Sequence, residues 1–366
     1  MSYRAAFLDW LACAEGGRDE PAARAARAAG DPVVAIGAAG HVLDFDDTFL
    51  PGIAHLSAPV APAALHVAAE VGATIEALLD AYAAGFEAMG ALARASHPAL
   101  YDRGFHPTAV CGSVGAAVAA ARLLDAPERP AVALAVLRAA GLRAAFGSDG
   151  KALQVGLAAA AGVAAARLAH HGASAPYERI AAAWHDAYGG TWEEPAPAAG
   201  PPAIAHNWIK AWPCCLQTHG AIECAAALDH VPDGPLTVVA HPVSRQAAGY
   251  DAVDTPLQAK FSIPYTTAYT LLHGPPTVDA FAALDPAAQR LAERIAVRTD
   301  PSLRESEFLL LAGDEELAHT EVARGSPENP LSPEDIKTKL DALAPGLDGA
   351  LDDMRRPAAE LLTRRP

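Results

Sequence analysis

Alanine and leucine recur at helical spacing through most of the chain between residues 5 and 229. This periodicity predicts a set of apolar helices, which we place at 64–79, 79–94, 108–124, 130–146, 151–170, 176–188 and 218–229. Some of these segments contain internal glycines, namely Gly112, Gly115, Gly156 and Gly162. Because glycine lowers helix propensity, we interpret these four positions as places where two helices pack closely.

The pattern changes after about residue 231. Strand-like segments follow at 235–242, 294–301, 306–313 and 317–325, with one helix predicted at 259–274. A last helical segment, 331–344, opens with a serine N-cap and an acidic first turn. We therefore predict a mainly α protein. It has a large all-helical domain, residues 1–230 completed by 329–366, and a smaller α+β domain, residues 231–328.

The composition excludes some classes of protein. Hydrophobic residues make up 52% of the 366, which excludes a disordered chain. The net charge of -16 disfavours nucleic acid and anionic membrane surfaces as partners. Of the five cysteines, Cys214 and Cys215 are adjacent and the others are scattered, which is not the pattern of a disulfide framework, so we expect free thiols. The N-terminal segment lacks a signal-peptide layout, and alanine-rich runs such as 155–166 are too short for a membrane span, so we expect a cytoplasmic protein.

Lysine is rare in this arginine-rich chain. The five lysines are Lys151, Lys210, Lys260, Lys337 and Lys339. A buried lysine can lose its proton and act as an acid or base, whereas arginine stays protonated. Each lysine has therefore either been retained by chance in a chain biased towards arginine, or has a function.

An acidic cluster lies in the segment HVLDFDDTF, residues 41–49. Its carboxylates repel one another unless something offsets their charge. A divalent metal is one possibility, but the position three after Asp47 is Leu50, so a third acidic ligand is missing and we expect no metal. Acids at a helix N-terminus are the alternative. Neither explains why the cluster lies beside His41, Thr48 and His55.

Further polar motifs lie on separate loops. In RGFHPT, Arg103 and His106 are suited to a small anion, although a Thr108 helix cap with a solvated histidine would look the same. Lys151 begins a helix, where the dipole opposes a cation, so it needs a partner. The segment KAWPCCLQTH contains no CxxC pair, so the sequence does not favour a zinc site there. A nucleophilic cysteine activated by a histidine is also possible, but we find no third group that would orient the histidine.

Together these acids, histidines, lysines and one arginine favour proton transfer next to a carboxylate. Removing a proton α to a carboxylate produces an enediolate-like anion, which needs nearby cations and a proton donor. Dehydration, decarboxylation and epimerisation of polycarboxylates share this requirement.

Several motifs occur in an order that resembles the MmgE/PrpD family, which contains 2-methylcitrate dehydratase, cis-aconitate decarboxylase and iminodisuccinate epimerase. They are HVLDFDDT, RGFHPTAVCG, DGKALQVG, KAWPCCLQTH, AKFSIPY and GSPENPLSPEDI, and they run from about residue 41 to 336. The resemblance implies a large helical domain with an α+β lid, a homodimer, and activity without metal or organic cofactor. It places active-site residues at Asp44, Thr48, His55, His106, Lys151, Lys210 and Lys260.

On this basis we hypothesise a cofactor-independent lyase, similar to 2-methylcitrate dehydratase, that acts on a small di- or tricarboxylate. The expected acid or base is His106 or Lys210, with Asp44, Thr48 and His55 completing the catalytic set. The expected carboxylate-binding residues are Arg103, Lys151, Lys260 and His219. An epimerase or isomerase, a decarboxylase, or a catalytically inactive binding protein remain alternatives.

Two departures from the family pattern bear on these alternatives. Gln154 stands where many members have a histidine. Cys215 stands where decarboxylase members carry a histidine, which argues mildly against decarboxylation.

Overall fold

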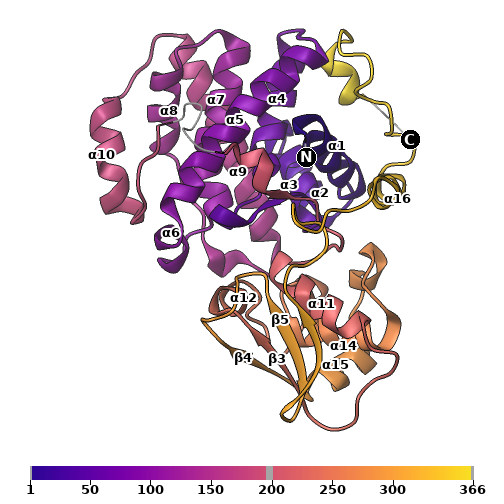
Figure 1. The fold of residues 1–366 in the computed structure, drawn as a ribbon. Helices are drawn as coiled ribbons and strands as arrows, with labels where there is room; N and C mark the ends of the chain where they lie inside the picture. Colours follow the sequence, from indigo (N-terminus) through magenta and orange to yellow (C-terminus); the bar gives the residue numbers. More distant parts are fainter. Residues whose placement is uncertain (1, 195–200, 364–366) are drawn as a thin grey trace.

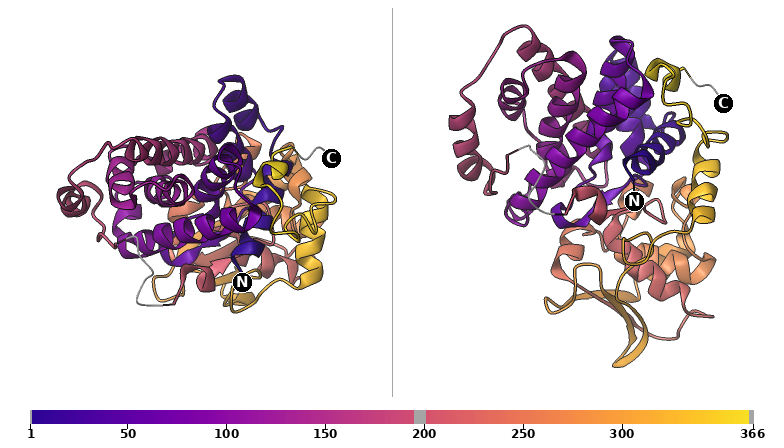
Figure 2. Two further views of the ribbon diagram at one scale, coloured as in Figure 1. Left: turned by 90° about the horizontal axis from the view of Figure 1, so that it is seen from above. Right: turned by 45° about the horizontal axis from the view of Figure 1, so that its top comes forward.

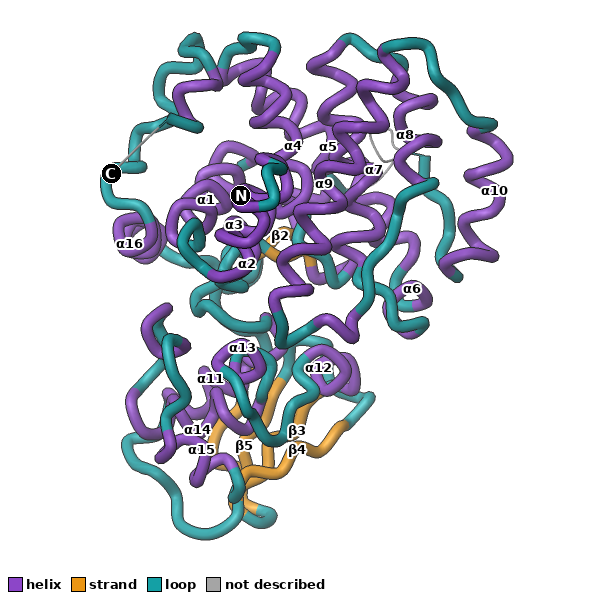
Figure 3. The backbone as a smooth tube through the Cα atoms, turned by 180° about the vertical axis from the view of Figure 1, so that it is seen from behind, coloured by secondary structure: helices purple, strands orange, loops and turns teal. Residues whose placement is uncertain are grey.

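The computed structural model describes residues 2–194 and 201–363. A bundle of helices forms one part of the molecule, and a four-stranded sheet with its own helices forms the other (Figure 1). Seen from behind, strands β3, β4 and β5 lie in the lower part, whereas the short strand β2 lies within the helical part (Figure 3). The expectation of a mainly α protein is confirmed.

Within residues 2–194, the described N-terminal stretch, ten α-helices build most of the helical part. They are α1 (Tyr3–Gly16), α2 (Pro21–Ala28), α3 (Pro32–Val42), α4 (Ser57–Glu70), α5 (Ile75–Ser96), α6 (Ala99–Asp102), α7 (Pro107–Leu124), α8 (Glu128–Val136), α9 (Asp149–His170) and α10 (Tyr177–Tyr188). Helices α7 and α9 pack against each other, and α9 also packs against α3. These contacts bring the C-terminal end of α3 beside the first turn of α9.

The four helical glycines lie at close helix contacts, as predicted. A Cβ atom on Gly156 would come within 2.5 Å of the Val34 carbonyl oxygen, and one on Gly115 within 2.7 Å of the Gly85 carbonyl oxygen. Cβ atoms on Gly112 and Gly162 would approach neighbouring atoms within 2.6 Å and 2.5 Å. A larger residue at these positions would push the helices apart.

Two helix predictions were wrong. The segment 64–79 breaks between α4 and α5, because Gly72 adopts φ +68° and Thr74 caps the next helix. The segment 130–146 is helical only as far as Val136. Gly141 then adopts φ +145°, which no helix allows, and Arg143 N–H donates to the Gly104 carbonyl. Residues 141–143 therefore lie against the RGFHPT segment, where Leu142 forms an antiparallel bridge with Phe105.

The sheet confirms the four predicted strands, β3 (Leu236–Ala240), β4 (Ile295–Thr299), β5 (Phe308–Ala312) and β6 (Glu315–Thr320). Their order is β4-β3-β5-β6, with β3 and β4 parallel and the other pairs antiparallel. Helices α11 (His219–Ala226) and α14 (Ile263–His273) pack with this sheet, and α15 (Pro286–Ala292) packs on α14. Figure 3 shows α12 (Pro242–Ala247) and α13 (Pro256–Ala259) between the sheet and the bundle. Helix α11, which we placed in the helical domain, instead packs on β5, where Gly220 contacts the Phe308 ring.

The C-terminal segment packs against the N-terminal helix α1. Helix α16 (Pro333–Leu343) begins with a capping box between Ser332 and Asp335. Its Lys339 Nζ lies 2.6 Å from Asp9 Oδ1 on α1. Figure 2 shows α16 beside the N-terminal helices. A buried ion pair therefore joins the two ends of the chain.

Two helices contain apolar stretches longer than the alanine-rich runs that we judged too short for a membrane span. By length and composition alone α7 and α9 could cross a membrane, but 83% and 61% of their apolar windows are buried inside the protein. Such burial is typical of core helices. All five cysteines are buried and free, as predicted.

Candidate active site

A short strand pair brings two distant motifs together. Strand β1 (Thr48–Phe49) pairs antiparallel with β2 (Asn207–Trp208), so the acidic segment lies beside Lys210. The acidic segment begins just after α3, where Asp44 adopts φ 53°. Aspartate tolerates this left-handed conformation better than most residues. The turn places its side chain among buried lysines.

Asp44 is the centre of the charge network. Lys210 Nζ donates to Asp44 Oδ1 at 2.6 Å and to its backbone oxygen at 2.9 Å, and also to the Cys214 carbonyl at 3.0 Å. Lys151 Nζ lies 3.3 Å from the same Oδ1. Burial alone would raise the pKa of Asp44, but the two lysines hold it well below its usual value. Asp44 therefore stays ionised, while its Oδ2 has no hydrogen-bond partner among the described residues.

Asp46 holds two histidine rings. His41 Nδ1 lies 2.9 Å and His55 Nδ1 3.1 Å from Asp46 Oδ2. Lys151 Nζ lies 2.7 Å from His41 Nε2, and because an ammonium can only donate, that nitrogen accepts. Burial, together with Lys210 and Lys151, lowers the pKa of His55 to about 3. Both rings are therefore neutral near pH 7, with their protons on Nδ1.

These three residues also meet the spacing of a metal site, because one ligand atom from each lies within 4.8 Å of the others. However, Asp46 already accepts from both rings, and the remaining nitrogen of His41 accepts from Lys151. The donor set is thus satisfied by a hydrogen-bond network, and a divalent cation would add charge beside buried lysines. Our expectation of no metal stays a prediction.

Five residues that we predicted for the site line one small cavity of about 30 Å³; they are Asp44, Thr48, His55, His106 and Lys151. His106 is the N-cap residue of α7, and Phe146 packs edge-on against its ring. Burial, with the charge of Lys151, lowers its pKa well below the usual value. The cavity thus combines a carboxylate, a cation and two neutral imidazoles.

Lys260 and Lys210 border this group without lining the same cavity. Lys260 faces an adjoining void of about 10 Å³ that Asp44 and Lys151 also line. Its Nζ donates to the Leu43 carbonyl at 2.7 Å, and burial lowers its pKa to about 8. All three predicted lysines therefore surround Asp44.

Two predicted binding residues lie elsewhere. Arg103 is exposed, and its Nη1 donates to the Asp186 carbonyl at 3.2 Å, in the last turn of α10. That helix end attracts a cation, and Gly104 turns the chain with φ +87° before His106. His219 is fully buried against Trp212, with both ring nitrogens unpaired among the described residues and a pKa lowered by burial to about 3. Our prediction of carboxylate contacts for both has no support here.

Sequence reasoning missed two polar residues of the same cavity. Tyr101 Oη and Gln217 Nε2 are buried without a hydrogen-bond partner in the described parts of the chain, and both residues line the cavity. An unsatisfied buried donor costs free energy unless a ligand completes it. Both residues belong to motif segments that we identified, but neither residue type by itself signals binding.

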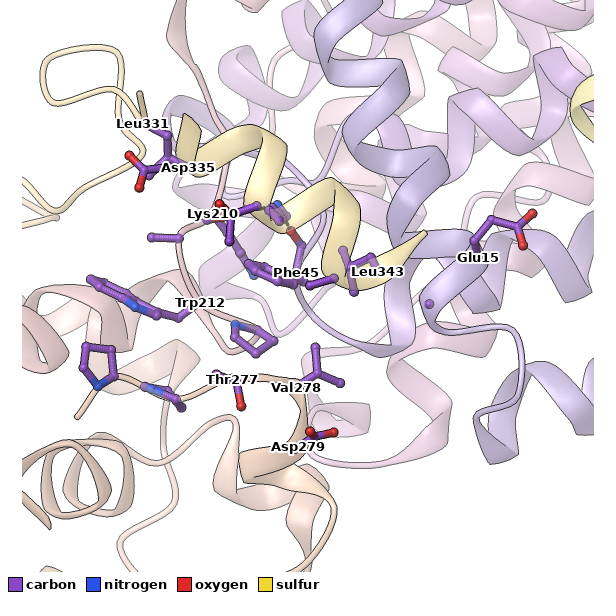
Figure 4. Close-up of a pocket in the computed structure, with 18 of the residues that line it drawn as sticks. Glu15, Phe45, Lys210, Trp212, Thr277, Val278, Asp279, Leu331, Asp335 and Leu343 are labelled. Atoms are coloured by element: carbon purple, nitrogen blue, oxygen red, sulfur yellow. Dashed lines mark hydrogen bonds between the residues drawn. The ribbon is translucent and has the colours of Figure 1, made fainter. Parts of the chain in front are cut away.

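A larger cavity of about 760 Å³ lies on the other side of Lys210. In Figure 4, Asp335 and Leu343 of α16 border it on one side, and Thr277, Val278 and Asp279 on the opposite side. Phe45 and Lys210 separate this space from Asp44. None of the described residues that line this cavity is a histidine, so the histidines of the site belong to the smaller cavity.

Comparisons with known proteins agree with this arrangement. The MmgE/PrpD N-terminal domain matches residues 29–189, and the MmgE/PrpD C-terminal domain matches residues 212–362. The chain is 28% identical over 347 residues to cis-aconitate decarboxylase of Mus musculus, covering 84% of this chain and 70% of that protein. It is 29% identical over 208 residues to cis-aconitate decarboxylase of Homo sapiens, covering 52% and 43%. The chain therefore belongs to the MmgE/PrpD family.

Proposed function

We propose that this protein is a cofactor-independent lyase that dehydrates a small di- or tricarboxylate by removing a proton α to a carboxylate. The observation that carries this proposal is the grouping of three buried lysines around Asp44, next to two neutral histidines that line a cavity with Asp44 and Lys151. Two ionised carboxylates, Asp44 and Asp46, do not neutralise three lysines, and buried charges are stable only when paired. A carboxylate of the substrate would complete the pairing.

The tautomer of His55 makes this residue the base. His55 carries its proton on Nδ1, towards Asp46, so its Nε2 has a free lone pair at the cavity. In the unliganded protein burial, together with the charges of Lys210 and Lys151, depresses the pKa of His55. A bound polycarboxylate would offset their charge and raise the basicity of His55 towards the range that proton abstraction needs.

The lysines divide into two roles. Lys210 is held by three acceptors, and although burial opposes its charge, Asp44 raises its pKa above the usual value. It therefore holds Asp44 in place and is a poor proton donor. Burial lowers the pKa of Lys151, which lines the cavity and is the better acid for the departing hydroxyl. The free Oδ2 of Asp44 would orient that hydroxyl.

We include a lid in this proposal. A cavity of about 30 Å³ holds only about two water molecules, so a polycarboxylate needs more room. Ala247 and Phe261, which precede and follow α13, close the cavity from the side of the sheet. A movement of the sheet part away from the bundle would open it.

Decarboxylation is the second candidate, supported by the two relatives named cis-aconitate decarboxylase. The cavity wall argues for dehydration instead. Cys215 lines it, and burial raises the pKa of this thiol to about 12. A neutral thiol there supplies neither charge nor a ready proton for the carbanion that loss of carbon dioxide leaves.

Proton NMR in D₂O tests the proposal, with the protein incubated with 2-methylcitrate, citrate, cis-aconitate and malate. Dehydration predicts loss of the α-proton signal together with an alkene product. Release of carbon dioxide from cis-aconitate would favour the decarboxylase, and deuterium exchange without an alkene would favour an epimerase. No exchange and no product with any acid would overturn the proposal. His55→Asn should lower turnover at least about 100-fold, whereas Lys337→Met, on the exposed side of helix α16, should not change it.

A further inference from the structure

The side-chain amide of Gln154 is oriented by the backbone of one residue. Its Oε1 accepts from Leu142 N–H at 2.8 Å, and its Nε2 donates to the Leu142 carbonyl at 3.3 Å. Reversing the amide would place oxygen against oxygen and N–H against N–H. The two contacts therefore determine which end of the amide is the nitrogen.

The same Nε2 lies 2.8 Å from Nδ1 of His106. An amide nitrogen can only donate, so Nδ1 must accept, and a neutral imidazole then carries its proton on Nε2. The ring has little freedom to turn, because Phe146 packs against it at a centroid distance of 5.0 Å and His41 stacks at 6.0 Å. The backbone N–H of His106 is also fixed, by a 3.0 Å bond to the Gly141 carbonyl.

We propose that Gln154 is a positioning residue that keeps His106 in the Nε2–H tautomer, so that this ring presents a hydrogen-bond donor to the cavity. His106 then cannot act as the base, because Nε2 is already protonated and Nδ1 is occupied. The catalytic role of the His106 tautomer rests on the proposed lyase function, whereas the tautomer itself is independent of that function.

The two histidines of the cavity therefore have opposite roles. His55 presents a lone pair and His106 presents an N–H, although both rings are neutral. In the proposed dehydration, His55 Nε2 takes the α-proton as the C–H bond breaks. The C–O bond then breaks, and the Lys151 ammonium gives its proton to the departing hydroxyl, forming water. His106 keeps its proton and donates a hydrogen bond to the enediolate oxygen, where the negative charge develops.

The charged and titratable groups facing His106 are consistent with a neutral ring. They are Lys151, His41, His55 and Asp44, and the net effect of burial and of the lysine is to oppose protonation. The Gln154 amide acts in the same direction, because an imidazolium would carry a second N–H directed at the amide N–H. Acquiring a proton would therefore break the contact that holds the ring.

The test is nitrogen NMR of the unliganded wild-type protein labelled with ¹⁵N-histidine, in which protonated and bare ring nitrogens give distinct signals. His106→Asn identifies the His106 signals by their loss. We expect a protonated Nε2 and a bare Nδ1 in the wild type. In Gln154→Glu the new carboxylate accepts from Nδ1, so we expect the proton to move to Nδ1. We also expect turnover to fall at least about 10-fold, the loss of one hydrogen bond to a charged group, with a smaller change in KM.

Gln289→Glu is the matched control. Gln289 Nε2 also donates to a backbone carbonyl, that of Val253, on helix α15 and outside the cavity. The same chemical change there should leave the His106 signals and the turnover unchanged. If Gln154→Glu does not fold, Gln154→Met removes the donor without adding charge and should give a mixture of the two tautomers.

A wild-type His106 protonated on Nδ1 would overturn the inference. So would an Nε2–H tautomer that persists unchanged in both Gln154 variants, because the amide would then not be its cause. If the wild type shows the expected tautomer and the variants lose it, yet no polycarboxylate reacts, the positioning role of Gln154 is supported and the proposed lyase function fails.

Discussion

Lys210 Nζ contacts Asp44 twice, at its carboxylate Oδ1 (2.6 Å) and at its backbone oxygen (2.9 Å). Asp44 is also the residue with φ 53° at the end of α3. The lysine therefore holds both the backbone and the side chain of a residue in a left-handed conformation, from a segment 166 positions further along the chain. This pair joins the helical part to the chain that leads into the sheet.

Lys210→Met should destabilise the protein. The substitution leaves the Asp44 carboxylate buried with Lys151 as its remaining cation, and breaking a buried pair costs on the order of 3 kcal/mol. Denaturant unfolding measures the loss. The double variant Asp44→Asn/Lys210→Met should recover part of it, and a double variant that is less stable than Lys210→Met would contradict the pairing.

Lys339→Met tests the ion pair at the end of the chain. Lys339 Nζ contacts Asp9 at 2.6 Å and the Phe45 and Lys210 carbonyls at 2.7 and 3.2 Å. Its removal should cost on the order of 3 kcal/mol of unfolding free energy and leave Asp9 buried without its cation. Lys337→Met, on the exposed side of the same helix, is the control and should not change stability measurably. Equal stability of the two variants would contradict a structural role for Lys339.

Asp47 should make the protein less stable at higher pH. Burial and repulsion from Asp46 raise its pKa to about 8, so the folded state keeps a proton that the unfolded chain releases near pH 4. The stability due to this group is complete below about pH 4 and is lost as the pH rises towards 8, by up to about 1.4 kcal/mol per pH unit. Asp47→Asn keeps an acceptor for Asn207 and removes the titration. Its stability relative to wild type should therefore grow between pH 5 and 8, as measured by denaturant unfolding, and a constant difference would contradict the raised pKa.

Tyr101→Phe separates binding from stability. The Tyr101 hydroxyl is buried without a partner among the described residues, so removing it should leave the melting temperature unchanged or raise it. If the hydroxyl donates to a bound substrate, KM should rise at least about 10-fold. Tyr82→Phe is the control, because that hydroxyl is bonded to Ser57 at 2.6 Å. It should lower the melting temperature and leave KM unchanged, and the same pattern in Tyr101→Phe would argue against substrate contact.

Metal removal should have no effect. His41, Asp46 and His55 are satisfied by one another and by Lys151, so dialysis against EDTA should change neither turnover nor melting temperature. Elemental analysis of the purified protein provides an independent measurement. A stoichiometric metal whose loss abolishes turnover would show that these residues are ligands.

Much of this protein was predictable because the evidence was local. Alanine and leucine recur with the helical period of about 3.6 residues, which predicted the helices. The loss of this period after about residue 231 predicted the four strands. Glycines inside apolar helices correctly marked the close helix contacts. The helix predicted to end at residue 146 ends at Val136. Beyond it, the positive φ of Gly141 is stabilised by contacts with the RGFHPT segment and not by its own neighbours.

The sequence by itself determined which residue types were available for chemistry, and five of the nine site residues that we predicted line one cavity. The tertiary structure decided how they meet. Arg103 could not be excluded from the sequence, because its direction depends on the turn at Gly104 and on the end of α10. The proton position on His106 depends on an amide 48 residues away, itself held by Leu142. Hydrogen bonds act over about 3 Å, so they depend on how distant segments pack and leave no periodic trace in the sequence.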